Sequence, residues 1–233
     1  KNESISSTVA QSLDYSKVNF SKFNPANLED INDIAFDTLG KNNKKFDWSA
    51  IDYTKLNTSS KTQIDWEDVD FKKAAKSTTF DLDVVDFSEI NTATTAKTKK
   101  VYRDINWEQV DYSELEENTR SRIDWAQVDF KEAKKASDFD LDYVDWTDIQ
   151  NATDAQTKKV IKTLDDTLLA TTDSVDILTG LKDSGRLSKK QLETVDSLIS
   201  SAQAQETPSI EAFILSDSSP QNDLTNDILD PLL

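Results

Sequence analysis

The sequence predicts a mainly α-helical protein, built as a tandem array of short capped helices with turn-like or β-like links and a C-terminal helical cap. Three observations predict it: a recurring aromatic and acidic phrase, aspartate at fixed places within that phrase, and apolar residues at helical spacing in the last third of the chain. We expect a flexible N-terminus at 1–12, the array at 13–156, the cap at 157–204 and an extended tail at 205–233.

The repeated phrase is clearest in IDWEDVDFKKA at 64–74, which returns as INWEQVDYSEL at 105–115 and IDWAQVDFKEA at 123–133. When its first isoleucine is numbered place 0, apolar residues stand at places 0, 2, 5, 7 and 10, and Asp or Asn stands at places 1 and 6 in nearly every copy. The stretch 64–101 also matches 123–160 at a fixed offset, which is typical of a stacked array. The copies begin near residues 13, 29, 46, 64, 80, 105, 123 and 139.

Aspartate at place 6 predicts the start of a short helix. In VDFSEI, Asp86 stands at the N-cap, and Glu89 stands where it completes a capping box. Val85 and Ile90 stand where a hydrophobic staple belongs. The equivalent predicted caps are Asp111 and Asp129 in other copies and Ser188 in the C-terminal part.

The aromatic side chains of the phrase are expected in the core. All five tryptophans lie in its copies, and large aromatic side chains are seldom left in the open. A core position is therefore favoured over an exposed stripe that binds sugars. One unit cannot bury its own aromatics, so each needs the next unit to cover them. The predicted repeat core includes Trp48, Trp66, Phe71, Phe87, Trp107, Trp125, Phe130 and Trp146.

Two family resemblances rest on these residues. The units of apolar residue, Asp and apolar residue resemble pentapeptide-repeat proteins, which implies a β-solenoid as the alternative fold. Places 1 and 6 agree with that family, whereas places 0 and 5 carry Ile, Phe or Val where it has small residues. The phrases IDWxxVDF and VNFSKF are similar to repeats of large surface-associated or calcium-associated proteins of marine cyanobacteria, over residues 13–150. This second resemblance implies an extracellular or cell-surface location. The Gly-rich calcium repeats of those proteins are absent here, so calcium binding is not carried over with it.

The last third of the chain predicts three helices. From about residue 157 apolar residues recur at helical spacing, and Thr172 or Asp173 can cap a second helix. Ser188 and Gln191 form the capping-box pattern of a third. These helices could close the end of the array, which stacked repeats require.

Composition excludes several classes of function. The 233 residues carry a formal net charge of −17, which disfavours nucleic acid and anionic membrane surfaces as partners. No apolar run approaches the ~20 residues of a membrane span. The chain has no Cys, no His and only three Gly, so thiol nucleophiles, His-based triads and phosphate-cradling loops are excluded. We therefore expect a protein that is not an enzyme.

One acidic cluster is a candidate calcium site. DFDLDYVD at 138–145 brings carboxylates together in sequence, and carboxylate oxygens are ligands for calcium. No glycine follows to turn the loop, and Ile149 stands where a calcium loop has Glu, so helix capping is the favoured interpretation. No other cofactor is expected. The candidate ligands are Asp138, Asp140, Asp142 and Asp145.

The function that these observations favour is structural. We expect a non-enzymatic, repeat-built subunit of an extracellular or cell-surface assembly, such as a filament, sheath or appendage. Such a chain would self-associate or join a larger protein assembly. The alternative is a calcium-binding or glycan-binding adhesive module. A carboxylate-based hydrolase is the third hypothesis, and it would need one singular carboxylate pair in a deep pocket.

Overall fold

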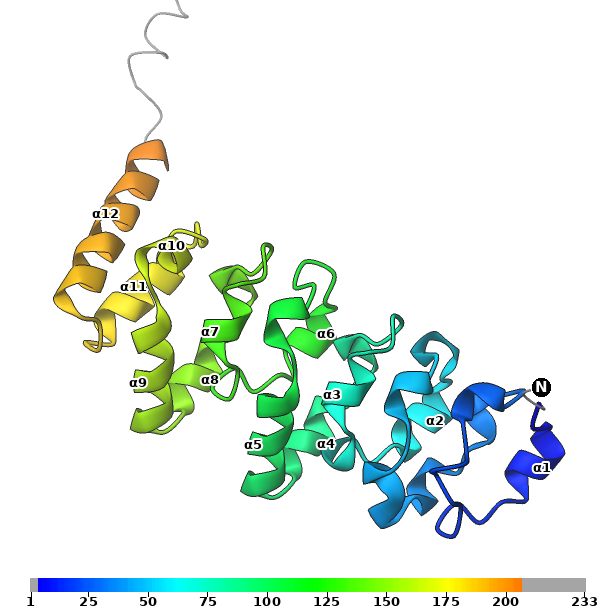
Figure 1. The fold of residues 1–233 in the computed structure, drawn as a ribbon. Coiled ribbons are helices and arrows are strands. Elements are labelled where there is room, and N and C mark those ends of the chain that lie inside the picture. Colours follow the sequence, from blue (N-terminus) through cyan, green and yellow to red (C-terminus); the bar gives the residue numbers. More distant parts are fainter. Residues whose placement is uncertain (1–3, 207–233) are drawn as a thin grey trace, which may run out of the picture.

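The computed structural model describes residues 4–206, which form an elongated stack of short helical units (Figure 1). Within these residues the only β pairing is an isolated bridge between Ile5 and Leu28. The predicted mainly α fold is confirmed, and the β-solenoid alternative is not supported. The large side chains at places 0 and 5 are the physical reason, because Phe46, Ile64 and Val69 are buried where a narrow solenoid has room only for small residues.

Most helices of the described residues are short, and both α-helices and 3-10 helices occur in the array. The longest helix lies at the C-terminal end. In chain order the elements are α1 (Ser7–Gln11), η1 (Pro25–Asn27), η2 (Ile31–Asp33), η3 (Phe36–Thr38), η4 (Gly40–Lys44), η5 (Trp48–Ala50), η6 (Tyr53–Lys55), α2 (Thr58–Gln63), η7 (Trp66–Asp68), α3 (Phe71–Ala74), η8 (Leu82–Val84), α4 (Phe87–Thr92), α5 (Thr95–Asp104), η9 (Trp107–Gln109), α6 (Glu117–Arg120), α7 (Phe130–Ala133), η10 (Leu141–Tyr143), α8 (Trp146–Asn151), α9 (Asp154–Thr163), α10 (Asp166–Leu169), α11 (Val175–Asp183) and α12 (Lys189–Glu206).

Each copy of the phrase is organised around two successive turns, and each turn is preceded by Asp or Asn except η3, which follows Ala35. In the copy at 64–74, Asp65 precedes η7, Val69 is extended, and Asp70 precedes α3. A 3-10 turn takes about three residues, so one turn with its two extended neighbours takes about five. The side chains at places 0, 2, 5 and 7 therefore point to the same side of the chain. This is why the apolar pattern fits neither the helical nor the strand period.

The fixed offset between the two matching stretches of sequence also separates their helices. The helices α2, α3, α4 and α5 each begin at that same offset before α6, α7, α8 and α9. We call 58–116 the first long repeat and 117–175 the second, and Figure 1 shows them as successive parts of one stack. Because α9 is the counterpart of α5, the repeat continues to Thr163 and beyond, and the predicted boundary at residue 157 falls inside α9.

The three helices after α9 close the C-terminal end of the stack. Helix α12 packs against α10 and α11. The Gln191 side chain donates to the carbonyl oxygens of Ile161, at 2.8 Å, and of Leu164, at 2.6 Å, at the end of α9. The last carbonyls of a helix have no partner within it, so α12 both covers the apolar end and satisfies these groups.

The core runs unbroken along the stack, and its aromatic side chains follow one hydrogen-bonding rule. The indole N–H of each of the five tryptophans donates to the carbonyl oxygen five residues earlier, at 2.8–3.3 Å. The hydroxyls of Tyr15, Tyr53 and Tyr112 donate in the same way. A buried donor without a partner would cost about 1–3 kcal/mol. The spacing of the repeat therefore places every such donor opposite an acceptor.

Neighbouring units are also joined by polar contacts. The backbone N–H of Trp66 lies 3.4 Å from Glu89 Oε2, and at the equivalent place in the second long repeat the N–H of Trp125 lies 3.1 Å from Asp148 Oδ2. The first N–H groups of a helical turn have no partner within it. In both long repeats the next unit supplies a carboxylate that accepts a hydrogen bond from such an N–H group. Stacking of the units therefore provides hydrogen-bond partners for backbone groups and also buries apolar surface.

The predicted caps begin turns and helices as follows. Asp86 accepts from the N–H groups of Ser88, at 2.9 Å, and of Glu89, at 3.3 Å, at the start of α4. The Glu89 side chain contacts Trp66 of the preceding unit, so it does not complete the predicted capping box. Two other caps accept backbone N–H groups: Asp129 from Lys131 at 3.1 Å, at the start of α7, and Asp111 from Glu114 at 3.3 Å, in a turn.

The caps of the C-terminal helices differ in one case from expectation. Ser188 and Gln191 form the reciprocal pair: the Ser188 N–H donates to Gln191 Oε1 and the Gln191 N–H donates to Ser188 Oγ. Helix α11 is capped by Ser174, in place of Thr172 or Asp173. The Thr172 hydroxyl is buried and donates to Asp142, so it is not free to cap α11.

The two ends of the chain were predicted to be flexible or extended. Helix α1 lies inside the N-terminal segment 1–12, and its Ala10 is buried. In the tail, residues 205 and 206 belong to α12, and residues 207–233 lie outside the described residues. Within residues 4–206, no helix combines the length and apolar character that crossing a bilayer requires.

Replacing the cap Asp86 by alanine is expected to destabilise the fold by about 1 kcal/mol, because the first N–H groups of α4 lose their acceptor. Urea denaturation followed by far-ultraviolet circular dichroism measures this change. Asp86→Asn is the matched control, since an asparagine side chain retains the cap acceptor, and it should recover most of the stability. Equal losses in the two variants would contradict a capping role.

Candidate binding cleft between the repeat units

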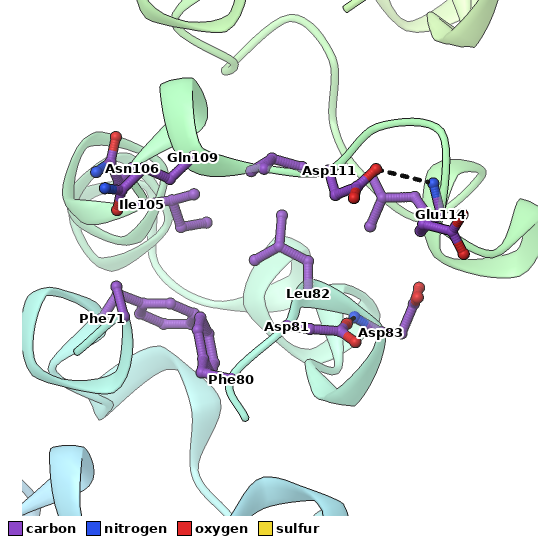
Figure 2. A pocket seen from close by; sticks show the side chains of 13 residues that line it. Phe71, Phe80, Asp81, Leu82, Asp83, Ile105, Asn106, Gln109, Asp111 and Glu114 are labelled. Carbon is purple, nitrogen blue, oxygen red and sulfur yellow. Dashed lines mark hydrogen bonds between the residues drawn. The ribbon is translucent and has the colours of Figure 1, made fainter. Parts of the chain in front are cut away.

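A cleft of about 320 Å³ lies between successive copies of the phrase in the first long repeat. Its walls come from Phe71 at the start of α3 and Ala75 just after it, from residues 80–83 around the start of η8, and from residues 105–115 (Figure 2). The floor is apolar, and its Phe71, Leu82, Ile105 and Leu115 are buried residues of the core. The floor and inner walls consist of Phe71, Phe80, Leu82, Ile105, Val110 and Leu115.

The rim of the cleft is acidic. Asp81, Asp83, Asp111 and Glu114 line it, and no lysine or arginine does. Figure 2 shows these four carboxylates on one side of the view and Asn106 on the other. None of the four takes part in an ion pair of the described residues. The cleft therefore combines an apolar floor with negative charge that no neighbouring cation neutralises.

Backbone hydrogen bonds hold three of the four rim carboxylates in place. Asp81 accepts from the N–H of Asp83, and Asp111 accepts from the N–H of Glu114 at 3.3 Å. Asp83 in turn accepts from the N–H of Glu116 at 3.2 Å. These carboxylates are therefore positioned by the turns of the repeat itself. The Glu114 side chain is exposed on the rim.

The second long repeat explains why the cleft is open. Its positions equivalent to Gln109 and Val110 are Leu168 and Leu169 of α10, which are both buried. In the first long repeat the same turn carries the exposed, polar Gln109 and the half-buried Val110. Where one repeat has a leucine that packs into the core, the other has a glutamine that stays in water. We infer that this difference leaves the apolar floor uncovered.

A second group of carboxylates lies in the copy at 64–74. Oxygen atoms of Asp65, Glu67 and Asp68 lie within 4.8 Å of one another, which is the only such group among residues 4–206. Lys97 already neutralises it, because its ammonium donates to Glu67 and, at 3.1 Å, to Asp68. The hydrogen bond to Glu67 is the main cause that raises the Lys97 pKa above its usual value. A metal ion at this group would have to displace that lysine.

One pair of carboxyl groups has perturbed acidity. Burial is the main cause that raises the pKa of Glu89 to about 7, and burial also raises the pKa of the neighbouring Asp65. Both side chains lie at the contact between units, and neither lines the cleft. This pair helps to join neighbouring units, since Glu89 accepts a hydrogen bond from the N–H of Trp66.

The four candidate calcium ligands do not converge among the described residues. Each of them accepts a hydrogen bond from the protein. Asp138 receives the N–H of Ser113 at 3.0 Å and Asp142 receives the hydroxyl of Thr172. Asp140 and Asp145 cap the turns that follow them, through the N–H groups of Asp142 and Thr147.

The eight aromatic residues predicted for the repeat core differ in how deeply they are buried. Seven of them are at most 1% exposed, and Trp146 is half-buried beside the C-terminal helices. A sugar ring needs an open aromatic face, which none of the seven offers. The seven are Trp48, Trp66, Phe71, Phe87, Trp107, Trp125 and Phe130.

Sequence reasoning missed the cleft. Its one signal is the contrast between Gln109 and Leu168 in the two long repeats, which emerges only when they are aligned position by position. Comparison with known proteins adds no assignment, since no protein-family model, curated protein or solved structure matches the chain.

Proposed function

We propose that this chain is a non-enzymatic structural protein, a repeat-built subunit of an extracellular or cell-surface assembly. The observation that carries the proposal is the unbroken stack of repeat units, which share one continuous core and are joined by hydrogen bonds from one unit to the next. Such a stack is an elongated scaffold, since each repeat contacts only its neighbours. Its acidic surface, with a net charge of −17, suits contact with other components of an assembly.

The charge pattern also supports this function over catalysis. Carboxylates at places 1 and 6 recur in nearly every copy, and many of them bind backbone N–H groups of their own turn. A catalytic carboxylate is normally singular. These recurring ones are explained by the turns that they begin.

The test of the proposal is the mass of the native particle. Light scattering on gently extracted material is expected to give a mass many times the 26.3 kDa of one chain, because a subunit of an assembly is held by its neighbours. Extraction at low and at high salt provides the control, since contacts made by an acidic surface weaken as salt screens them. A native mass equal to that of a single chain under both conditions would contradict the proposal.

A further inference from the structure

We propose that the cleft between the repeat units binds a basic segment of a partner protein, in which lysine or arginine alternates with apolar residues. This inference rests on the proposed function and names the chemistry of one contact within the assembly. Two features of the cleft carry it, namely the apolar floor and the uncompensated acidic rim.

The floor requires an apolar group. Phe71, Leu82 and Ile105 come from three successive copies of the phrase, so the floor is the part of the continuous core that the cleft reaches. A volume of about 320 Å³ is at the lower end of the usual range for ligand sites. It suits one or two side chains of an extended segment. At the equivalent turn of the second long repeat the chain itself places Leu168, which indicates the kind of side chain that fits.

The rim requires a cation. Elsewhere in the array some acidic groups are paired with lysines of the chain: Lys97 pairs with Glu67 and Asp68, and Lys134 pairs with Asp165 at 2.6 Å. No basic side chain lines the cleft. A cation that pairs with this rim would therefore come from another molecule. A lysine or arginine side chain suits it, because its long apolar stem can lie along the floor while its charged end reaches the rim.

Other occupants fit less well. Oxygen atoms of the rim carboxylates do not gather within 4.8 Å as a set of metal ligands would. The chain's own segment 205–233 contains six acidic residues and no basic residue. A second copy brings a net charge of −17 toward a rim of the same sign. Electrostatic attraction favours a basic partner and also speeds its association.

The test is the binding of a defined probe to the whole chain. The probe is a fluorescein-labelled amidated peptide of alternating leucine and lysine, followed by fluorescence anisotropy. The double variant Asp83→Asn with Glu114→Gln is expected to bind it about tenfold more weakly, because two rim charges are lost. The matched control is Asp37→Asn with Asp183→Asn, which removes the same charge at exposed positions outside the cleft and should change affinity by less than about twofold.

A third variant separates the floor from the charge. Ala75→Trp places an indole in the cleft without altering any charge and should abolish binding. Circular dichroism of each variant verifies the fold. The proposal would be overturned if the cleft pair and the control pair weakened peptide binding equally, or if Ala75→Trp bound the peptide as well as the wild type does. Failure of the wild-type chain to bind the peptide would also overturn it. The native mass is measured without the probe, so a large native particle combined with no peptide binding would refute the cleft proposal alone.

Discussion

Replacing Trp107 by alanine is expected to destabilise the protein by about 3–5 kcal/mol, the usual range for truncating a fully buried tryptophan. Urea denaturation followed by far-ultraviolet circular dichroism measures the change. The total stability of a domain is only about 5–15 kcal/mol, so the variant should unfold at a much lower urea concentration than the wild type.

The expected size follows from where Trp107 lies. It begins η9, its indole N–H donates to the Tyr102 carbonyl at 2.8 Å, and its ring stacks on that of Tyr102. Its own carbonyl accepts the Tyr112 hydroxyl at 2.8 Å. The Tyr102 hydroxyl in turn accepts the N–H of Asp124 at 2.6 Å. The cavity left by the indole would therefore loosen a network that joins successive units.

Two controls separate volume from hydrogen bonding. Trp107→Phe retains most of the ring but leaves the Tyr102 carbonyl without its donor, so it should cost about 1–3 kcal/mol. Trp146→Ala removes a half-buried indole with a longer hydrogen bond, at 3.3 Å, and should cost less than Trp107→Ala. If Trp107→Ala cost no more than Trp146→Ala, the continuous core would not be the main source of stability.

The fold follows from local rules that can be read along the chain. An aspartate before an aromatic or leucine residue of the phrase begins a turn, so the sites of most turns in the array could be predicted. Their kind could not be predicted from the residue that follows the aspartate, because the turn after place 1 and the turn after place 6 can begin with the same residue type. Asp65 precedes a 3-10 helix and Asp145 an α-helix, although a tryptophan follows both.

What could not be predicted depends on contacts between units. Glu89 was expected to complete the cap of its own helix, but it reaches Trp66 in the preceding unit. Helix α9 was assigned to the cap because apolar residues recur at helical spacing from about residue 157, whereas its position makes it the counterpart of α5. The cleft depends on the absence of a core side chain at Gln109, and an absence has no local signature. Stacking decides each of these features.

The contact between units should make stability depend on pH through Glu89. Burial is the main cause that raises its pKa to about 7, with further contributions from the neighbouring charges of Asp65 and Asp86. The Glu89 carboxyl also faces the Trp66 N–H, and the positive charge of Lys97 counteracts the rise in the pKa of the neighbouring Asp65. In the unfolded chain the pKa of a glutamate is about 4.3. The stability that protonated Glu89 contributes is therefore complete below about pH 4.3 and is lost as the pH rises to about 7.

Replacing Glu89 by glutamine should remove this loss. A glutamine remains neutral, and its amide oxygen can still accept the Trp66 N–H. At pH 8 the variant is expected to be more stable than the wild type by about 1–2 kcal/mol, a value reduced for the partial exposure of the carboxyl. At pH 4 the two proteins should agree within a few tenths of a kcal/mol, since Glu89 is largely protonated in both states there. Urea denaturation at several pH values between 4 and 8 measures the difference.

The matched control is Glu114→Gln, which removes the same formal charge from an exposed position on the cleft rim. Its effect on stability should be small at every pH, because the Glu114 carboxylate is exposed to water. A gain at pH 8 confined to Glu89→Gln would assign the pH dependence to the contact between Glu89 and Trp66. The same gain in both variants would assign the pH dependence to the general repulsion of a chain with a net charge of −17. The Glu89 carboxyl group would then make no specific contribution to the contact between units.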